Sequence, residues 1–401
     1  MIYSLFSIII NKLIDYIFIV KKVFFGKYLK FDRGEKIRAV FILTFDLEWD
    51  CFNTIYKYFL ESEYFDVLVI ADEFTRDNGL LPSEFLKQTG VDFINAEEFS
   101  LSEHKPHLIF IADVFSITRN RWILRSDARI CYIPYGTSIS AAAYSYRHQY
   151  NLPLHNKAWR VFVAGDFVVK LYREHCDSGS SHVVAMGHPK FEAIYSSPRQ
   201  HRSPTNEFSR KEPCEVLWNI HSERDGQWST WNDYGLYVLR LFASLDDVKL
   251  VCRPHPFFFD SFKEKKEMEY TRNLIINNKN TVIDQRPSIK ESFASCDALL
   301  TDGSSIIYDF FFTSKPILYL RSSDSAYMHS HCFDLINKYH YIGDGKDKIK
   351  TFVKKVVCKD DPLTKRRMDG LLRDSGLPDS LGTGKNIGRY IKNEMNNETE
   401  H

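Results

Sequence analysis

The sequence predicts an α/β protein built from two successive doubly wound parallel sheets, and three observations lead to that prediction. The chain has 401 residues, enough for two medium-sized domains and too many for one ordinary core. Short apolar runs alternate with helical stretches and stop at Gly or Asp, as strands do in a parallel sheet covered on both faces. A polar stretch over 196–213, rich in Pro, Arg and Ser, divides the runs into two series.

The first series predicts a domain over 31–200. A helical stretch over 53–63 follows its first run, and helical or polar stretches separate the others. The runs that we expect to be strands are 39–44, 65–71, 108–112, 130–133, 161–164 and 182–186.

The second series predicts a domain over 201–375, and the polar residues 376–401 form a tail that either frays or packs as a terminal helix. Ligands of such sheets bind beyond the carboxyl ends of the strands, so we expect the two domains to face one shared cleft. The second series of expected strands is 215–218, 248–252, 281–283, 298–300 and 317–320.

Residues 1–30 are very apolar but too interrupted for a membrane-spanning helix, which needs about 18 consecutive apolar residues. The interruptions are Asn11, Lys12, Asp15, Lys21 and Lys22. No early basic region or small-residue cleavage site indicates a signal peptide. The pattern favours an amphipathic helix on an anionic membrane surface. The alternative is a helix packed on the protein's own surface.

Composition excludes several classes of protein. A net charge of +1 gives no general case for a nucleic-acid partner. The eight cysteines contain no CxxC pair, so neither a disulfide framework nor a zinc site is predicted, and a reducing compartment is the simplest interpretation. Cys131 and Cys252 lie in apolar runs and are expected in the core.

The stretch TDGSSIIYDFFFTSKPILYL, which begins at Thr301, places a polar turn between a buried strand and a helix. Ser304 or Ser305 can cap that helix, whose free N–H groups and partial positive charge suit a phosphate. Plain N-capping explains the serines equally well. Asp302 would repel a phosphate unless its carboxylate binds a hydroxyl group or orients the loop.

Arg253-Pro254-His255-Pro256 follows another predicted strand of the same domain. Two prolines stiffen this loop, and a fixed Arg–His pair suits a pyrophosphate or a leaving phosphate, with His255 donating a proton or a hydrogen bond. The alternative is a structural turn with a solvated arginine. His221, after the first strand of this domain, is either a ligand contact or a surface histidine.

In the first domain, Tyr135-Gly136-Thr137 closes a strand, and Gly136 lets a substrate approach the backbone. Gly187-His188-Pro189-Lys190 ends a later strand. Three further residues could accept a proton, namely His148, His155 and Asp113.

Several of these segments are similar to one known family. TDGSSIIYDF from Thr301, followed by Lys315-Pro316-Ile317, resembles the signature of the CDP-glycerol glycerophosphotransferase family, the teichoic-acid and capsule polyol-phosphate transferases. The loop at Arg253 is similar to that family's basic-His-Pro segment.

Two more segments extend the resemblance over roughly 130–320. Gly187-His188-Pro189-Lys190 looks like the family's Gly-x-Pro-Arg/Lys element, and Tyr135-Gly136-Thr137 stands where its His-Gly-Thr motif would be. The combination in this order is fairly specific, although each segment alone is a weak signal.

The resemblance implies a GT-B-like architecture of two Rossmann-like domains, the second binding a CDP-linked polyol donor and the first an acceptor. From the resemblance and the strand ends we predict these donor-binding residues: Arg253, His255, Asp302, Gly303, Ser304, Ser305 and His221. The predicted acceptor-binding residues are Gly136, Thr137, His188 and Lys190. The predicted catalytic residues are His255, Tyr135 and His155.

Two positions depart from the family pattern. Tyr135 stands where the family's histidine is thought to act as general base, and a phenol with a pKa near 10 is a poor base at neutral pH. Another residue then takes the proton, or the acceptor differs. Gly303 replaces an aromatic residue that is usual between Asp and Ser, which bears on the identity of the donor.

The resulting hypothesis is an enzyme that transfers a glycerol- or ribitol-phosphate type group from a CDP-linked donor to a hydroxyl of a bacterial surface glycan or its lipid-linked precursor, releasing CMP. The alternatives are a nucleotide-sugar glycosyltransferase and a non-catalytic scaffold of a glycan assembly complex. No protein-bound metal or cofactor is predicted, while Mg²⁺ carried by the donor pyrophosphate stays open. The expected location is the inner face of the bacterial cell membrane, with the protein bound peripherally.

Overall fold

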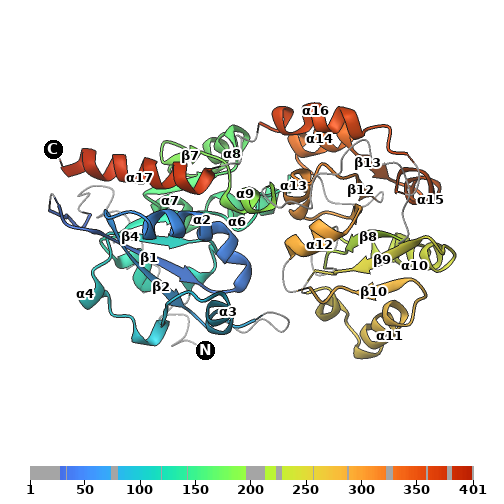
Figure 1. The fold of residues 1–401 in the computed structure, drawn as a ribbon, viewed down its shortest axis with the longest axis horizontal. Coiled ribbons are helices and arrows are strands. Elements are labelled where there is room, and N and C mark those ends of the chain that lie inside the picture. The colour runs from blue at the N-terminus through green and yellow to red at the C-terminus, as the bar shows by residue number, and fades with distance from the viewer. Residues whose placement is uncertain are drawn as a thin grey trace. The chain divides into compact units, whose positions relative to one another are not determined.

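The computed structural model describes residues 28–32, 34–73, 80–118, 120–141, 143–195, 213–222, 228–255, 257–286, 289–321, 328–357, 360–376 and 382–399. The chain divides into two compact units. Unit 1 comprises residues 1–135, 147–192 and 380–401. Unit 2 comprises residues 136–146 and 193–379. Figure 1 labels their helices and strands.

Unit 1 contains a parallel sheet of seven strands in its described residues, in the order β3-β2-β1-β4-β5-β6-β7. This is the doubly wound order, in which the chain direction across the sheet reverses between β1 and β4. The strands are β1 (Ile37–Leu43), β2 (Phe65–Ala71), β3 (Ile94–Asn95), β4 (Leu108–Ile111), β5 (Arg129–Tyr132), β6 (Arg160–Val163) and β7 (Val183–Ala185).

Short helices connect these strands, and the chain passes between the units within α6 (Ala143–Tyr150) and α9 (Pro189–Tyr195). A short 3-10 helix, η1 (Asp46–Glu48), precedes α2. The remaining α-helices of unit 1 are α2 (Trp49–Leu60), α3 (Pro82–Thr89), α4 (Leu101–His104), α5 (Arg121–Arg125), α7 (Pro153–Lys157), α8 (Asp166–His175) and α17 (Thr383–Thr399).

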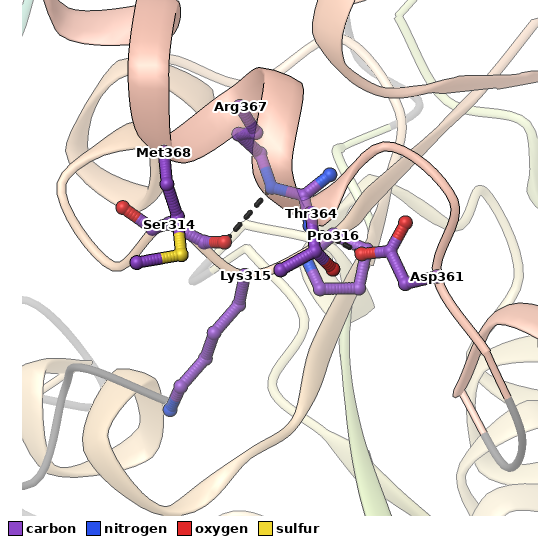
Figure 2. Close-up of a pocket in the computed structure, with 7 residues that line it drawn as sticks. All are labelled: Ser314, Lys315, Pro316, Asp361, Thr364, Arg367 and Met368. Atoms are coloured by element: carbon purple, nitrogen blue, oxygen red, sulfur yellow. Dashed lines mark hydrogen bonds and ion pairs between the residues drawn. The ribbon is translucent and has the colours of Figure 1, made fainter. Parts of the chain in front are cut away.

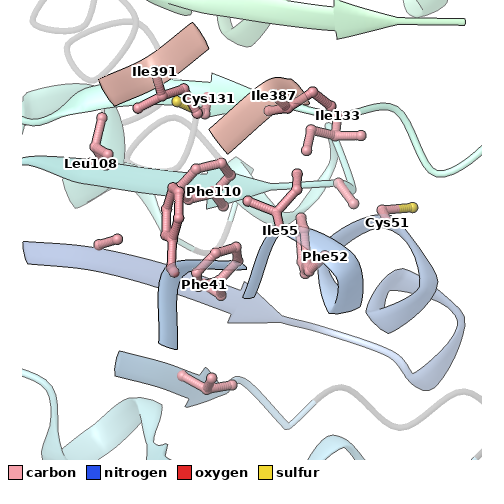
Figure 3. Packing of buried hydrophobic residues seen from close by; sticks show 14 of the residues in the cluster. Phe41, Cys51, Phe52, Ile55, Leu108, Phe110, Cys131, Ile133, Ile387 and Ile391 are labelled. Carbon is pink, nitrogen blue, oxygen red and sulfur yellow. The ribbon is translucent and has the colours of Figure 1, made fainter. Parts of the chain in front are cut away.

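The core of unit 1 lies between the sheet and helices α2 and α17 (Figure 3). Phe41 of β1 stacks on Phe110 of β4, with ring centroids 4.4 Å apart and an interplanar angle of 13°. Phe52 of α2 meets Phe41 edge-on. Burial of such rings supplies much of the hydrophobic stabilisation of this sheet.

Helix α17 belongs to this core, so the C-terminal residues do not fray but pack as a helix. Ile387, Ile391 and Met395 are fully buried in the core of unit 1. A Cβ atom on Gly384 would lie 2.2 Å from Thr54 Oγ1 of α2, so this helix pair needs a glycine at the contact. The sequence shows this helix as polar because only one face carries apolar residues.

Unit 2 contains a six-stranded parallel sheet in its described residues, in the order β10-β9-β8-β11-β12-β13. Its chain direction reverses between β8 and β11, as that of unit 1 does between β1 and β4. The strands are β8 (Cys214–Asn219), β9 (Val248–Cys252), β10 (Thr281–Ile283), β11 (Ala298–Thr301), β12 (Ile317–Leu320) and β13 (Tyr341–Gly343).

The helices of unit 2 pack on its apolar strands, and an amphipathic pair near the end of the sheet, α15 and the π-helix η7 (Phe352–Val357), contributes to the core. The α-helices of this unit are α10 (Leu236–Ala243), α11 (Lys265–Ile276), α12 (Ile289–Ser295), α13 (Ile306–Phe311), α14 (Ser330–Tyr339), α15 (Lys346–Thr351) and α16 (Thr364–Asp374).

The predicted fold of two parallel-sheet α/β domains is confirmed. Cys131 and Cys252 are buried, as expected. The predicted amphipathic helix over 1–30 falls almost wholly outside the described residues, as does the polar stretch that separates the two series of strands. Within the described part of the chain, no helix is both long and apolar enough to cross a membrane.

Candidate active site

The reversal of strand order in unit 2 lies between β8 and β11, where ligands of doubly wound sheets bind. The loop after β8 carries His221, and the loop after β11 carries Asp302 to Ser305. β9, the other neighbour of β8, ends at the loop of Arg253 and His255. All seven predicted donor-binding residues therefore follow three adjacent strands of one sheet.

Asp302 ties two of these loops together. Its carboxylate accepts the backbone N–H of His221 at 2.8 Å through Oδ1 and that of Thr230 at 2.9 Å through Oδ2. The side chain is only 2% exposed. These contacts are those of a residue that orients the loop, which is one of the two roles considered for this carboxylate.

Ser304 and Ser305 are not explained by capping. Ser305 occupies the N-cap of α13 without a side-chain capping hydrogen bond. Among the described residues, neither serine hydroxyl makes a hydrogen bond. Gly136 lies beside this turn, because a Cβ atom added to it would be 3.2 Å from Ser305 Oγ. The Ser305 hydroxyl and Gly136 thus border the same small region.

His221 and His255 form a pair at the ends of β8 and β9. Their ring centroids are 4.8 Å apart, with an interplanar angle of 31°. The backbone N–H of Phe257 donates to Nδ1 of His255 at 3.2 Å, so a neutral His255 ring carries its proton on Nε2. The backbone N–H of His255 donates to Ile220 O at 2.7 Å, which fixes the loop to β8.

Arg253 is anchored from behind. Its Nη1 lies 3.1 Å from Oδ2 of Asp284 and donates to the carbonyl oxygen of Arg286 at 2.8 Å. Burial raises the pKa of Asp284, but hydrogen bonds from Ser292 and Arg253 outweigh it and leave the pKa below its ordinary value. An ionised carboxylate thus fixes the orientation of the Arg253 side chain. The contact of Arg253 with donor phosphates remains a prediction.

The corresponding reversal in unit 1 lies between β1 and β4, and it holds a residue that the sequence analysis missed. Glu48, in η1 after β1, is completely buried. Its Oε2 accepts the N–H of Thr44 at 2.5 Å, the hydroxyl of Thr44 at 3.0 Å and the N–H of Phe45 at 3.3 Å. Among the described residues its Oε1 has no hydrogen-bond partner.

Burial is the main cause that raises the pKa of Glu48, to about 8, and the negative charge of Asp113 adds to it despite the opposing hydrogen bonds from Thr44. Asp113 follows β4 and is buried as well. Nothing in the local sequence marks Glu48 as different from the exposed acidic residues around it, beyond its position between aromatic residues.

Tyr135 lies three residues after the end of β5, and the residue is 42% exposed. Its ring meets Phe45 edge-on at 5.6 Å. Gly136 and Thr137, predicted to bind the acceptor with the first domain, group instead with unit 2. The reason is local pairing, since Ser140 bridges Met328 within that unit.

His188 and Lys190, also predicted to bind the acceptor, are buried. His188 donates from Nε2 to the carbonyl oxygen of Pro134 at 2.6 Å and accepts the N–H of Lys190 at Nδ1, 3.2 Å away. Burial lowers its pKa to about 4. The contacts make His188 a brace for the turn that precedes Tyr135.

His155, predicted as catalytic, lies in the interior of unit 1 and is fully buried. It packs against Tyr132 and Tyr172, and its Nδ1 accepts the N–H of Leu152 at 2.9 Å. Burial lowers its pKa to about 3, so the ring stays neutral. A histidine enclosed in this way is unsuited to deprotonate a substrate, whereas His148 on α6 is exposed.

The Lys315-Pro316 part of the sequence signature has a structural role. The Nζ of Lys315 donates to the carbonyl oxygens of Phe293, Ala294 and Cys296 at 2.6, 3.0 and 2.7 Å, which caps the end of α12. Figure 2 shows the pocket beside it, where Arg367 holds the carbonyl oxygen of Ser314. This pocket lies before β12, at the amino-terminal ends of the strands, whereas the candidate site lies at their carboxyl ends.

Metal ligands are not gathered in the part of the chain that the structure describes, where no group of three or more His, Cys, Asp or Glu side chains could hold an ion. The finding concerns protein ligands alone and does not test whether Mg²⁺ accompanies a donor pyrophosphate.

The fold defines the class of protein as GT-B-like, with two doubly wound domains, and solved structures share it. A putative UDP-N-acetylglucosamine 2-epimerase from Listeria monocytogenes aligns with a TM-score of 0.61 at 12% identity, over 90% of this chain and 97% of that chain. A UDP co-structure of MnaA from S. aureus gives 0.61 at 15% identity, with the same coverage. At these identities the likeness concerns the fold.

The wall teichoic acid polymerase TagF also has this fold, with a TM-score of 0.57 at 12% identity over 97% of this chain and 99% of that chain. Residues 222–340 match the family model of CDP-glycerol:poly(glycerophosphate) glycerophosphotransferases. The resemblance predicted from the sequence is confirmed over these residues, which are similar to the glycerophosphotransferase family. No curated protein matches the chain.

Proposed function

We propose that the protein transfers a polyol phosphate of the glycerol- or ribitol-phosphate type from a CDP-linked donor to a hydroxyl group of a bacterial surface glycan or its lipid-linked precursor. CMP is the leaving product. The donor binds unit 2, at the reversal of strand order between β8 and β11.

One observation carries the proposal. The region that matches the glycerophosphotransferase family contains the loops of His255 and of Ser304–Ser305, which follow β9 and β11, the two strands on either side of β8 in a doubly wound sheet. Histidine N–H groups, serine hydroxyls and backbone N–H groups are the donors that a pyrophosphate needs. A TagF structure from a CDPG soak, although only 12% identical, supports this class of donor.

The reaction breaks one P–O bond and forms another. The acceptor hydroxyl attacks the phosphorus that carries the polyol, and the bond between that phosphorus and the CMP oxygen breaks. CMP leaves with the electron pair, and the hydroxyl proton passes to a base. His255, with its Nε2 proton, and the hydroxyls of Ser304 and Ser305 stabilise the charge that develops on the phosphate oxygens.

Asp113 is our proposed base in preference to His155 and Tyr135. His155 is enclosed and neutral, and the phenol of Tyr135 is a weak base near pH 7. Asp113 follows β4 at the switch point of the first sheet. Tyr135, at the end of the neighbouring strand, would then position the acceptor rather than deprotonate it.

The protein is proposed to act on the inner face of the cell membrane. This rests on the interrupted apolar sequence of residues 1–30, which suits an interfacial helix. Mg²⁺ is proposed to accompany the donor pyrophosphate without protein ligands of its own. Activity that survives EDTA undiminished would remove the metal from this scheme.

The test is CMP release by the full chain from CDP-glycerol and CDP-ribitol, with UDP- and GDP-sugars offered in parallel. We expect one CDP-polyol to be hydrolysed slowly without acceptor and faster with it. His255→Ala and Ser305→Ala should each lower this release by about 10²-fold or more. His175→Ala, a partly exposed histidine on α8 of unit 1, is the matched control and should keep full activity.

Product analysis separates this function from its alternatives. A phosphodiester product with CMP supports the transfer of polyol phosphate. Turnover of a UDP- or GDP-sugar to a glycoside, with no use of CDP donors, would replace the proposal by a glycosyltransferase. Binding of none of these nucleotides would indicate a non-catalytic scaffold.

A further inference from the structure

Trp228 lies directly across Gly303 in the loop of the candidate donor site. A Cβ atom added to Gly303 would be 1.9 Å from Cε3 and 2.6 Å from Cζ3 of Trp228. No real Cβ contact is that short, so any other residue at 303 would displace the indole. The glycine is required by the space that Trp228 fills, and the indole itself is only 7% exposed.

Backbone hydrogen bonds join the same two loops on either side of this contact. The N–H of Gly303 donates to the carbonyl oxygen of Trp228 at 3.3 Å. Two residues further on, the N–H of Thr230 donates to the carboxylate of Asp302. These two hydrogen bonds, Gly303 N–H to Trp228 O and Thr230 N–H to Asp302, form a junction between the two loops, and the indole of Trp228 covers it. A buried indole adds a large apolar contact to polar bonds that are weak on their own.

The junction fixes residues that the proposed function uses. Ser304 and Ser305 follow Gly303 directly in the chain. The carboxylate that binds Thr230 also binds the N–H of His221, whose ring pairs with that of His255 at 4.8 Å. Displacing the indole would thus loosen the serine turn and the histidine pair together.

We propose that Trp228 is a positioning residue of the donor site, which sets the distance between the Ser304–Ser305 turn and the His221–His255 pair through its contact with Gly303. This inference rests on the proposed function, since it assigns the phosphate-binding groups to these residues. Trp228 acts through its neighbours and needs no contact with the donor.

The first experiment compares Trp228→Ala with Trp228→Phe in the full chain. Calorimetry measures the affinity of each variant for CMP and CDP-glycerol. Steady-state kinetics give kcat and KM for CDP-glycerol. We expect Trp228→Ala to lower kcat/KM by about 10- to 100-fold, because misplaced groups lose most of their effect. Trp228→Phe keeps a ring on the glycine and should remain within about fivefold of the wild type.

A double-mutant cycle tests the contact itself. Gly303→Ala should impair CDP-glycerol binding as Trp228→Ala does, because the new methyl group expels the indole. In the Trp228→Ala background the same methyl group meets no ring, so Gly303→Ala should add little further loss. Additive losses would overturn the proposed contact mechanism.

A control separates positioning from general destabilisation. Gly370→Ala crowds Tyr339 elsewhere in unit 2, where a Cβ atom would lie 2.5 Å from the phenol oxygen. It should lower the melting temperature and leave the affinity for CDP-glycerol unchanged.

The outcomes distinguish this inference from the proposed function. Normal CDP-glycerol affinity and kcat in folded Trp228→Ala would overturn the positioning role and leave the function standing. Loss of affinity in Gly370→Ala as large as that in Trp228→Ala would reduce the effect to stability and overturn it as well. A wild type that binds neither CMP nor CDP-glycerol would refute the function, and this inference with it.

Discussion

The two sheets share one strand order, yet the buried carboxyl groups at their switch points are held differently. In unit 2 each oxygen of Asp302 accepts a backbone N–H. In unit 1 all the described hydrogen bonds of Glu48 go to Oε2. Both side chains are buried almost completely.

The difference shows how backbone donors decide the role of a buried carboxyl group. N–H groups aimed at both oxygens stabilise a negative charge and turn the carboxylate into a junction between loops. When donors reach one oxygen alone and a second carboxylate lies nearby, burial dominates and the proton is kept. Asp302 is therefore an organiser of its site, while Glu48 is a neutral acid whose charge depends on pH.

The largest effect is expected from Asp302→Asn, which breaks the comparison in unit 2. The amide keeps the size of the side chain but turns an N–H₂ group toward one of the two backbone N–H donors. We expect a loss of about 3 kcal/mol in the free energy of unfolding, because a buried donor loses its acceptor. CMP release should fall with it, since the serine turn and His221 share this carboxylate.

Urea unfolding and CMP release measure the two effects on the same samples. Asp246→Asn, an exposed carboxylate that pairs with Lys279, is the control and should change stability by less than about 0.5 kcal/mol. Wild-type stability in Asp302→Asn would show that the carboxylate does not hold the junction.

The sequence predicts the parts of this comparison that depend on local pattern. Strands β9, β10 and β12 begin and end where their apolar runs do. Strands β3 and β13 were missed, since two or three residues give no recognisable run. The strand-end positions of His255 and Asp302 followed from the same pattern, with parallel order as the only added assumption.

The rest depends on tertiary contacts that leave no local signal. Residues 136–146 join unit 2 through the bridge of Ser140 to Met328, almost 190 residues away in the chain. Trp228 sits beside a glycine of a different loop, and neither residue reveals the other. Glu48 is buried in the folded chain, whereas its sequence neighbourhood is that of an ordinary helix start.

Glu48→Gln tests the comparison in unit 1, and the size of its effect on stability depends on pH. The folded protein holds the Glu48 proton up to a pKa of about 8, whereas the unfolded chain releases it near the ordinary value of 4.5. Folded molecules thus bind more protons between these values, and wild-type stability falls as pH rises through this window, by at most about 1.4 kcal/mol per pH unit. The glutamine variant lacks this contribution.

Unfolding by urea at pH 5, 6, 7 and 8 measures the difference between the two proteins. We expect the free energy of unfolding of Glu48→Gln to rise relative to the wild type at each step, because all other titrating groups cancel. A difference that does not change with pH would mean that Glu48 is ionised in the folded protein.

The smallest effects are expected from substitutions of Thr44 and Thr230, whose hydroxyl groups donate hydrogen bonds to these carboxyl groups. Thr44 Oγ1 lies 3.0 Å from Glu48 Oε2, while Thr230 Oγ1 lies 3.5 Å from Asp302 Oδ2, where a hydrogen bond is weak. Thr44→Val should therefore cost about 1 kcal/mol in the free energy of unfolding and Thr230→Val less than about 0.5 kcal/mol. Valine has nearly the shape of threonine, so urea unfolding of the pair isolates the hydroxyl contribution. The reverse order would indicate that Asp302 depends on its hydroxyl donor more than on the two backbone N–H groups, and the contrast between the two switch points would fail.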